Sequence, residues 1–196
     1  MKNVLGNLEK GLLFVVSAPA GTGKTTLVRM LAEEFPCVQQ SVSYTTRLPR
    51  PSEVDGIDYN FVDEAEFKKR IESGDFIEHV HLFDHYYGTS LSHIQMLQEQ
   101  GKHVILVIDT EGALQLKEQV RATLIFISPP SVDHLRERML KRSTEAEEVI
   151  QQRVARAEQE LAAQKNYDYT VENDDLEIAY QVLRSVVIAV EHAVNK

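Results

Sequence analysis

The feature that most constrains the fold is a small-residue loop between two apolar segments. An apolar run at residues 12–16 precedes the loop, and apolar residues at helical spacing over 27–31 follow it. This order predicts a strand, a tight loop and a helix. The loop ends in Gly23-Lys24-Thr25, an ending typical of phosphate-binding P-loops. Backbone N–H groups of such a loop and of the helix N-terminus converge on one anion, so the segment predicts a nucleotide site rather than an ordinary strand–turn–helix.

Each loop residue has a role in that prediction. Gly21 and Gly23 allow backbone φ values that side chains disfavour. Lys24 is expected to reach the β- and γ-phosphates of ATP, and the Thr25 hydroxyl to hold the accompanying Mg²⁺. Ala18 stands where the P-loop pattern has its first glycine, a mild change if its φ is negative. The expected ATP-binding residues are Ala18, Pro19, Ala20, Gly21, Thr22, Gly23, Lys24, Thr25 and Thr26.

Length and composition restrict the remaining possibilities. The chain has 196 residues, enough for one domain with small insertions. Its formal net charge of −9 argues against a general nucleic-acid or membrane-surface binder. The single Cys37 excludes an internal disulfide and fits a reducing compartment. Neither a signal-peptide core nor a membrane-length apolar run is visible, so we expect a soluble, cytoplasmic protein without nucleic-acid or membrane partners. The oligomeric state stays open.

Strand-like apolar runs alternate with helical stretches along most of the chain. This alternation predicts an α/β fold with a parallel sheet covered by helices on both faces. The last helix is expected to begin near Asn173-Asp174-Asp175, a capping residue type followed by acids. The expected strands are residues 12–16, 104–108, 123–127 and 169–171.

Two stretches do not fit a plain alternation of strands and helices. Residues 37–88 are rich in aromatic and β-branched side chains and contain one helix signal, the capping box from Asp63 to Glu66. They predict a strand-rich insertion. Residues 131–164 are charged and helical, with an expected break at 143–145, and predict a helical lid over the phosphate loop. The core then comprises residues 1–36, 89–130 and 165–196.

The insertion carries a candidate second phosphate site. Arg47 and Arg50 are three residues apart, and Pro49 stiffens the turn between them. Guanidinium groups suit bidentate recognition of phosphate, and the hydroxyls of Tyr59 and Tyr87 could add donors. Each arginine alone could equally be a solvated surface residue. A P-loop in the same chain favours the phosphate site.

Several segments, in order, resemble those of guanylate kinases. The most specific is residues 41–61, SVSYTTRLPRPSEVDGIDYNF. The other matching segments are residues 76–80, 86–89, 108–113 and 173–175, the P-loop, and the arginines Arg138 and Arg142. The resemblance covers nearly the whole chain. It implies a P-loop NTPase core with a GMP-binding insertion and a lid, and transfer of the γ-phosphoryl of ATP to GMP (and dGMP).

The resemblance also implies site residues. GMP-phosphate contacts would come from Arg47, Arg50, Tyr59 and Tyr87, and guanine contacts from Ser43, Glu78, Thr89 and Asp109. A carboxylate such as Glu78 suits guanine because it can accept both N1–H and the exocyclic amino group. Adenine would leave that carboxylate unpaired, which supports strong discrimination. The alternative for Glu78 is an exposed strand residue.

Phosphoryl transfer requires in-line positioning and positive charge around the moving group. Lys24 and three lid arginines are the expected sources of that charge. Arg138 and Arg142 are four residues apart and share a helix face, and Arg153 matches a further arginine of the family pattern. Neighbouring glutamates leave open that these arginines only form surface ion pairs.

The chain departs from the family pattern at four positions. Val107 replaces the first aspartate of the family's Asp-x-Asp-x-x-Gly segment, which leaves the surroundings of the metal open. Glu111, Ser52 and Ser143 replace a glutamine and two glycines. None of these changes removes a phosphate ligand.

The sequence argues against a metal centre and against two other functions. His79, His81 and His85 lie close together, but no cysteine or clear carboxylate set completes a zinc site. A guanylate-kinase-like module that binds phosphopeptides without catalysis would typically lack the P-loop lysine, which this chain retains. A kinase for another nucleoside monophosphate disagrees with Glu78 and the Arg47 segment.

Overall fold

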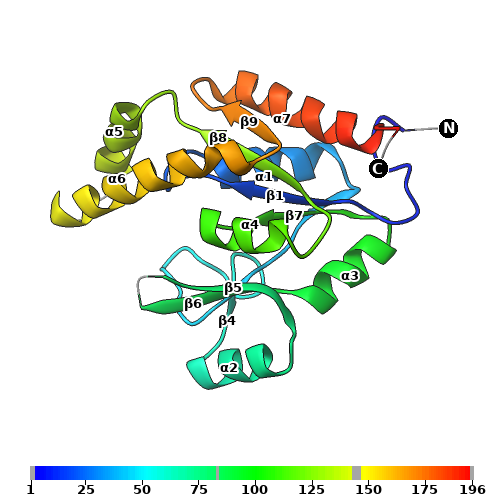
Figure 1. Ribbon diagram of the computed structural model, residues 1–196, viewed down its shortest axis with the longest axis horizontal. Coiled ribbons are helices and arrows are strands. Elements are labelled where there is room, and N and C mark those ends of the chain that lie inside the picture. The colour runs from blue at the N-terminus through cyan, green and yellow to red at the C-terminus, as the bar shows by residue number, and fades with distance from the viewer. Residues whose placement is uncertain (1–2, 83, 143–146, 195–196) are drawn as a thin grey trace.

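The computed structural model describes residues 3–82, 84–142 and 147–194, without the side chains of 138–153. Strands and helices alternate along the chain, as Figure 1 shows. The strands are β1 Leu13–Ser17, β2 Val38–Gln40, β3 Tyr44–Thr45, β4 Asn60–Phe61, β5 Phe76–Leu82, β6 His85–Ser90, β7 His103–Val107, β8 Thr123–Ser128 and β9 Tyr169–Glu172. The helices are α1 Lys24–Glu34, α2 Glu64–Glu72, α3 Leu91–Glu99, α4 Thr110–Lys117, α5 Val132–Arg142, α6 Glu147–Ala162 and α7 Leu176–Glu191, with a 3₁₀ turn at Ala163–Asn166.

The core is a five-stranded parallel sheet in the order β2-β7-β1-β8-β9. The four strands expected from the apolar runs all belong to it, which confirms the α/β prediction. Val16 of β1 pairs with Val107 of β7 and with Ile125 of β8, so β1 lies in the middle. The P-loop therefore leaves the carboxyl end of a central strand, the usual position for ligands in open α/β sheets.

Helices cover both faces of this sheet. Phe14 and Val16 of β1 pack against α1 and α7 on one face. The alternate residues, Leu13 and Val15, pack against α3 and α4 on the other. This alternation follows from the two-residue period of a strand, and burial on both faces explains why the central strands are continuously apolar.

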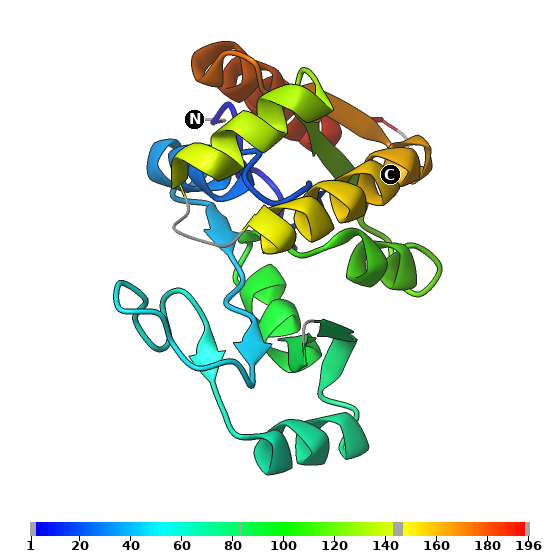
Figure 2. The same cartoon turned by 90° about the vertical axis from the view of Figure 1, so that its left-hand side faces the viewer.

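The insertion forms a second sheet of four strands in the order β4-β3-β6-β5. Figure 2 shows it as a separate layer below the core. Its helix α2 begins as expected, because the side chain of Asp63 accepts a hydrogen bond from Glu66 N at 2.8 Å. One detail differs from the expectation: β2, residues 38–40, lies within the stretch assigned to the insertion but pairs with β7 of the core sheet.

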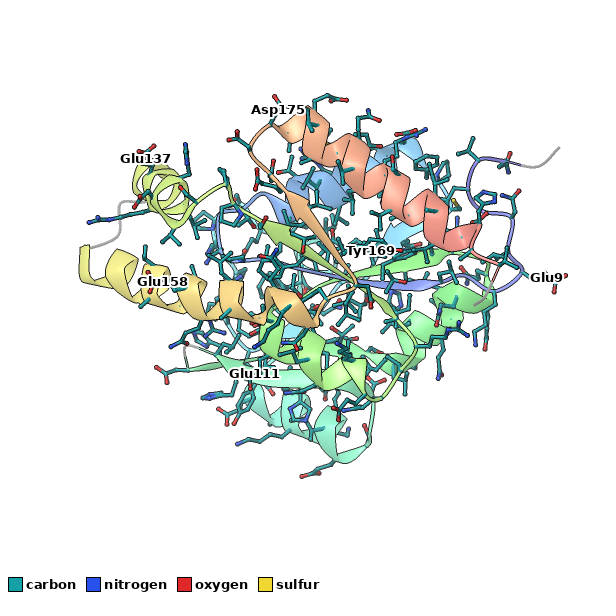
Figure 3. The ribbon with its side chains drawn as sticks, turned by 45° about the horizontal axis from the view of Figure 1, so that its top comes forward. Glu9, Glu111, Glu137, Glu158, Tyr169 and Asp175 are labelled. Atoms are coloured by element: carbon teal, nitrogen blue, oxygen red, sulfur yellow. The ribbon has the colours of Figure 1, made fainter. Side chains whose placement is uncertain are left out.

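The C-terminal half contains a pair of packed helices, α5 and α6, and the last helix, α7. Helices α5 and α6 pack on each other through Leu135, Val154 and Ala157 and lie on the opposite side of α4 from the insertion in Figure 1. Figure 3 shows Asp175 at the N-terminal end of α7. Its side chain caps that helix by accepting from Ile178 N at 2.9 Å, which confirms the expected start. Over the described residues, no helix has the length and apolar character needed to cross a bilayer.

Candidate active site

The P-loop between β1 and α1 has the backbone that an anion site requires. Gly21 and Gly23 have φ values of 86° and 90°, where a side chain would strain the chain. Asp84 is the single non-glycine with positive φ among the residues described, so Ala18 sits where its short Cβ is tolerated. Thr22 is fully buried and closes the loop by donating from its hydroxyl to the Pro19 carbonyl at 2.8 Å.

Asn173 supports the loop from the other end of the sequence. This buried side chain follows β9, and its Nδ2 donates to the Thr22 carbonyl at 2.6 Å. A Cβ on Gly23 would lie only 2.7 Å from the same nitrogen. Gly23 is therefore required both by its φ and by the close approach of Asn173. The sequence predicted a helix-capping role near Asn173 and did not reveal this contact.

Lys24 is the first residue of α1 and turns back over the loop. Its ammonium donates to the Ala18 carbonyl at 3.3 Å. Burial lowers the pKa of Lys24, while the carboxylates of Glu160 and Asp109 oppose that shift. The amine is thus held beside the loop within the electrostatic reach of two acids from later parts of the chain. Thr25 follows it on an exposed part of the first helical turn.

The four expected phosphate ligands of the insertion come together. The guanidinium carbon of Arg47 lies 5.4 Å from the centre of the Tyr59 ring, and that ring is 6.0 Å from the ring of Tyr87. The pKa of Arg47 is raised, because contacts with Glu53 and Tyr87 outweigh the cost of burial. Arg50 is largely exposed on the same turn. The four residues therefore lie in one cluster, and their role in binding phosphate stays a prediction.

Glu53 completes this cluster and was not singled out from the sequence. It accepts from Arg47 at 2.9 Å and from the backbone N–H of Arg50 at 2.8 Å. Partial burial disfavours its charge, but the hydrogen bond from Arg47 lowers the pKa of Glu53 below its usual value. Glu53 thus fixes the turn and orients Arg47 with an anionic group. Its spacing of three residues from Arg50 was the available sequence signal.

The four expected guanine contacts also converge, on a buried carboxylate. Glu78 of β5 is 5% exposed, which rejects the exposed-strand alternative. The Thr89 hydroxyl donates to it at 2.5 Å, and Ser43 lies 3.3 Å from Thr89. Asp109 lies across Gly112 from it, since a Cβ on Gly112 would be 2.7 Å from Glu78 Oε2 and 3.3 Å from Asp109 Oδ1. Burial raises the pKa of Glu78 to about 7, Thr89 opposes this, and Asp109 adds to it.

Asp109 also connects Glu78 to helix α6, which belongs to the stretch expected to form a lid. One of its oxygens caps α4 by accepting from Gly112 N at 2.9 Å. The other accepts from Arg156 at 3.1 Å, and Arg156 also donates to Glu160 at 3.1 Å. The sequence gives no local signal for the ion pair of Arg156 with Asp109, because the two residues are 47 positions apart. Glu160 was not singled out either, although its i,i+4 spacing from Arg156 was an available signal.

The remaining expected residues are placed only in part. Arg138 lies in α5, Arg142 ends that helix and Arg153 lies in α6, but their side chains are outside the described residues, as is the whole of Ser143. Val107 ends β7 and packs against the core cluster shared by β1, α1 and α7. Ser52 and Glu111 are exposed.

The histidines of the insertion do not form a three-ligand cluster. His79 and His81 are both exposed on the same face of β5, as a strand period of two requires. Across the described ranges, no group of three histidine, cysteine, aspartate or glutamate side chains is placed to hold a metal ion.

Comparison with known proteins identifies relatives of the chain over nearly its full length. The guanylate kinase family profile matches residues 10–190. Guanylate kinase of Protochlamydia amoebophila is 56% identical over 97% of both chains, and guanylate kinase of Chlamydia felis is 52% identical over 92% of this chain and 89% of its own.

A solved structure also shares the fold. The crystal structure of guanylate kinase from Anaplasma phagocytophilum superposes with a TM-score of 0.78 at 29% identity, covering 97% of this chain and 91% of that one. Family profile, relatives and structure agree over nearly the full length, and the chain belongs to the guanylate kinase family.

Proposed function

We propose that this protein transfers the γ-phosphoryl group of ATP to GMP, and to dGMP, giving ADP and GDP. The observation that carries the proposal is the position of Asp109. It lies against Glu78 across Gly112, and its charge also acts on the P-loop lysine, Lys24. The carboxylates proposed to bind the base thus lie within electrostatic reach of the P-loop lysine, so both nucleotides would bind in one region of the molecule.

Recognition of GMP divides between two ends of the insertion. Arg47, Arg50, Tyr59 and Tyr87 would bind the monophosphate, with Glu53 holding Arg47 in orientation. Ionised Glu78 would accept N1–H and the exocyclic amino group of guanine. Ser43, Thr89 and Asp109 would complete the base site. A buried acceptor pair left unpaired by adenine gives the discrimination against AMP.

The ATP end provides positive charge and backbone donors. Loop N–H groups and Lys24 would hold the β- and γ-phosphates, and Arg138, Arg142 and Arg153 of the lid would add charge on closure. The transferring group passes from the ATP oxygen to a GMP phosphate oxygen, so no side chain needs to form a covalent bond.

The donor set fits a magnesium ion that enters with ATP. Thr25 offers a hydroxyl on the exposed first turn of α1, whereas Val107 adds no ligand. Mg²⁺ usually retains several waters and takes the remaining ligands from substrate phosphates. Bound there, it would neutralise phosphate charge during transfer.

Two other functions make different predictions. A phosphopeptide-binding module would use the Arg47 cluster without catalysis, and the apolar Val107 is the one feature that favours it. A kinase for another nucleoside monophosphate would not need the carboxylates of Glu78 and Asp109 for base recognition. The retained Lys24 and the buried Glu78 support the guanylate kinase. We place the reaction in the cytoplasm, in keeping with the single cysteine.

A coupled assay of ADP release tests the proposal. The wild-type protein is incubated with ATP, Mg²⁺ and one of GMP, dGMP, AMP, CMP or UMP. We expect release with GMP and dGMP and little with the other three. Release with another nucleotide in preference to GMP would reassign the substrate, and no release with any of the five would favour the binding module.

A further inference from the structure

The guanidinium group of Arg156 connects helix α6 of the expected lid to the carboxylates proposed to bind the base. Arg156 lies in the second half of α6 and donates to Asp109 Oδ2 and to Glu160 Oε1, both at 3.1 Å. Its side chain is 30% exposed, and those of Asp109 and Glu160 are 18% and 11% exposed. Partly buried ion pairs of this geometry resist screening better than exposed ones and hold their partners in one orientation.

The partner Asp109 has little freedom left. Its Oδ1 accepts from Gly112 N at 2.9 Å, and the same oxygen faces Glu78 across Gly112. Because Arg156 donates to Oδ2, both oxygens of the Asp109 carboxylate accept hydrogen bonds. Rotation of the Asp109 side chain would break the α4 cap or the ion pair. The presence of Arg156 therefore fixes the surface that Asp109 presents toward a bound base.

We propose that Arg156 is a positioning residue for guanine recognition, which acts through Asp109 and ties the lid helix α6 to the carboxylate pair Asp109–Glu78. The role rests on the proposed function, because it assumes that this pair faces guanine. It assigns Arg156 a task different from the phosphate contacts expected of the other lid arginines. A lid that moves would carry Arg156 with it and change the charge beside the base.

The charges around Glu78 make this role measurable. Thr89 of β6 donates to it and contacts Ser43, which precedes β3. Asp109 faces it from the start of α4, and Lys24, Arg156 and Glu160 lie around Asp109. Asp109 already raises the pKa of Glu78. Removing the cation that neutralises Asp109 would raise it further. Less Glu78 would then be ionised at neutral pH.

Kinetics of Arg156→Ala test the proposal, with Arg156→Lys as the conservative variant. We expect R156A to raise KM for GMP about tenfold, from the loss of a charge-assisted contact, and to change KM for ATP less than about twofold. The pH at which kcat/KM for GMP reaches half its maximum should move upward. R156K, which keeps the charge, should recover most of both effects.

Arg184→Ala is a matched control. Arg184 is also 30% exposed and pairs with Glu34 at 2.8 Å, near the end of α1 that is remote from the P-loop. We expect wild-type kinetics from it. If R156A shows no cooperative thermal transition, Arg156→Gln replaces it, because Gln keeps part of the side-chain stem and a hydrogen-bond donor but carries no charge.

A double-mutant cycle with Asp109→Asn tests whether Arg156 acts through Asp109. If Arg156 acts through Asp109, R156A should add almost nothing to the KM for GMP of D109N. Full additivity, or an R156A effect on KM for ATP alone, would overturn the proposal, as would GMP kinetics and a pH profile equal to those of wild type. Absence of wild-type activity with GMP would instead overturn the proposed function, and this role with it.

Discussion

At the residue scale, the proposed recognition of guanine would depend on the ionisation of Glu78. Burial raises the pKa of this carboxyl to about 7, with Asp109 adding to the shift. Only the ionised form accepts both guanine donors. We therefore expect kcat/KM for GMP to rise as the pH increases through about 7, while KM for ATP stays nearly constant. A flat GMP profile between pH 6 and 8 would contradict a base-reading role for Glu78.

The ionisation of Glu78 also affects the stability of the free protein. Rising pH, which should increase kcat/KM for GMP, should decrease that stability. A carboxyl whose pKa is raised on folding is protonated in the folded state and ionised in the unfolded state between about pH 4.5 and 7. Stability of the free protein is therefore lost as the pH rises through this window. Glu78→Gln should raise the melting temperature at pH 8 more than at pH 5.

Glu78→Gln should also impair use of GMP by roughly 10- to 150-fold in kcat/KM, the worth of one hydrogen bond to a charged group. Its amide would oppose one guanine donor with its own NH₂. IMP, which lacks the exocyclic amino group, serves as the comparison substrate. The variant should lose much of the preference for GMP over IMP. Equal use of both by the wild type would refute the assignment.

Lys24→Ala separates the two nucleotide sites. Lys24 contacts the ATP loop through the Ala18 carbonyl, whereas the phosphate cluster of Arg47 lies on the insertion. The variant should lose transfer, by a factor of 10² or more, yet bind GMP with nearly wild-type affinity. Calorimetric titration of GMP measures this. Parallel loss of GMP affinity and activity would contradict separate sites.

At the scale of elements, the end of α7 holds the N-terminal segment against β7 through Glu191. This buried carboxylate accepts from Gly6 N at 2.6 Å, from Asn7 Nδ2 at 2.8 Å and from His103 Nε2 at 2.5 Å. His103 Nδ1 accepts from Leu12 N, so Nε2 carries the proton. Although burial opposes its charge, these donors lower the pKa of Glu191 to about 2.

Glu191→Gln should therefore destabilise the protein at pH 7 by about 2–3 kcal/mol, because one amide oxygen cannot serve all of these donors. A depressed pKa gives stability that is present above about pH 4.5 and lost as the pH falls toward 2. Urea unfolding at pH 7 and pH 3 should show the difference from wild type shrinking with acidity. Glu33→Gln, in a pair that is about 70% exposed on both sides, is the control with little effect.

Elements with strong local signals could be predicted from the sequence. The P-loop strand and helix, the Asp63 cap and the start of α7 follow from apolar period and capping chemistry. Strand β2 could not, because Val38, Gln39 and Gln40 are too few and too polar to show a pattern. The candidate site divides in the same way between local patterns, which the sequence shows, and long-range contacts, which it does not. Arg47 and Arg50 share a short motif, whereas the contacts Asn173–Thr22 and Arg156–Asp109 join distant segments.

At the scale of the whole molecule, the residues proposed to bind the substrates are distributed over three parts of the chain. The P-loop belongs to the core, Arg47 to the insertion and Arg156 to the lid. Where their side chains are described, helices α5 and α6 pack through Leu135, Val154 and Ala157. Active-site lids generally belong to the regions that open at low free-energy cost. Ile77 of the insertion, by contrast, packs into the core cluster with α3 and α4, which limits movement of β5.

We therefore expect the lid and the outer part of the insertion to close only when both nucleotides are bound. Closure would exclude water that could otherwise accept the phosphoryl group, and would bring the lid arginines onto it. Small-angle scattering measures the radius of gyration of the free protein, each single complex and the complex with a bisubstrate analogue. Only the last should be clearly more compact. ATP with AMP is the control that should not close the protein. Adenine offers no pair of donors to the Glu78 carboxylate, which would stay without hydrogen bonds from the base. An equal radius in every state would mean that the cleft is already formed, and the specificity for GMP would then have to arise from binding alone.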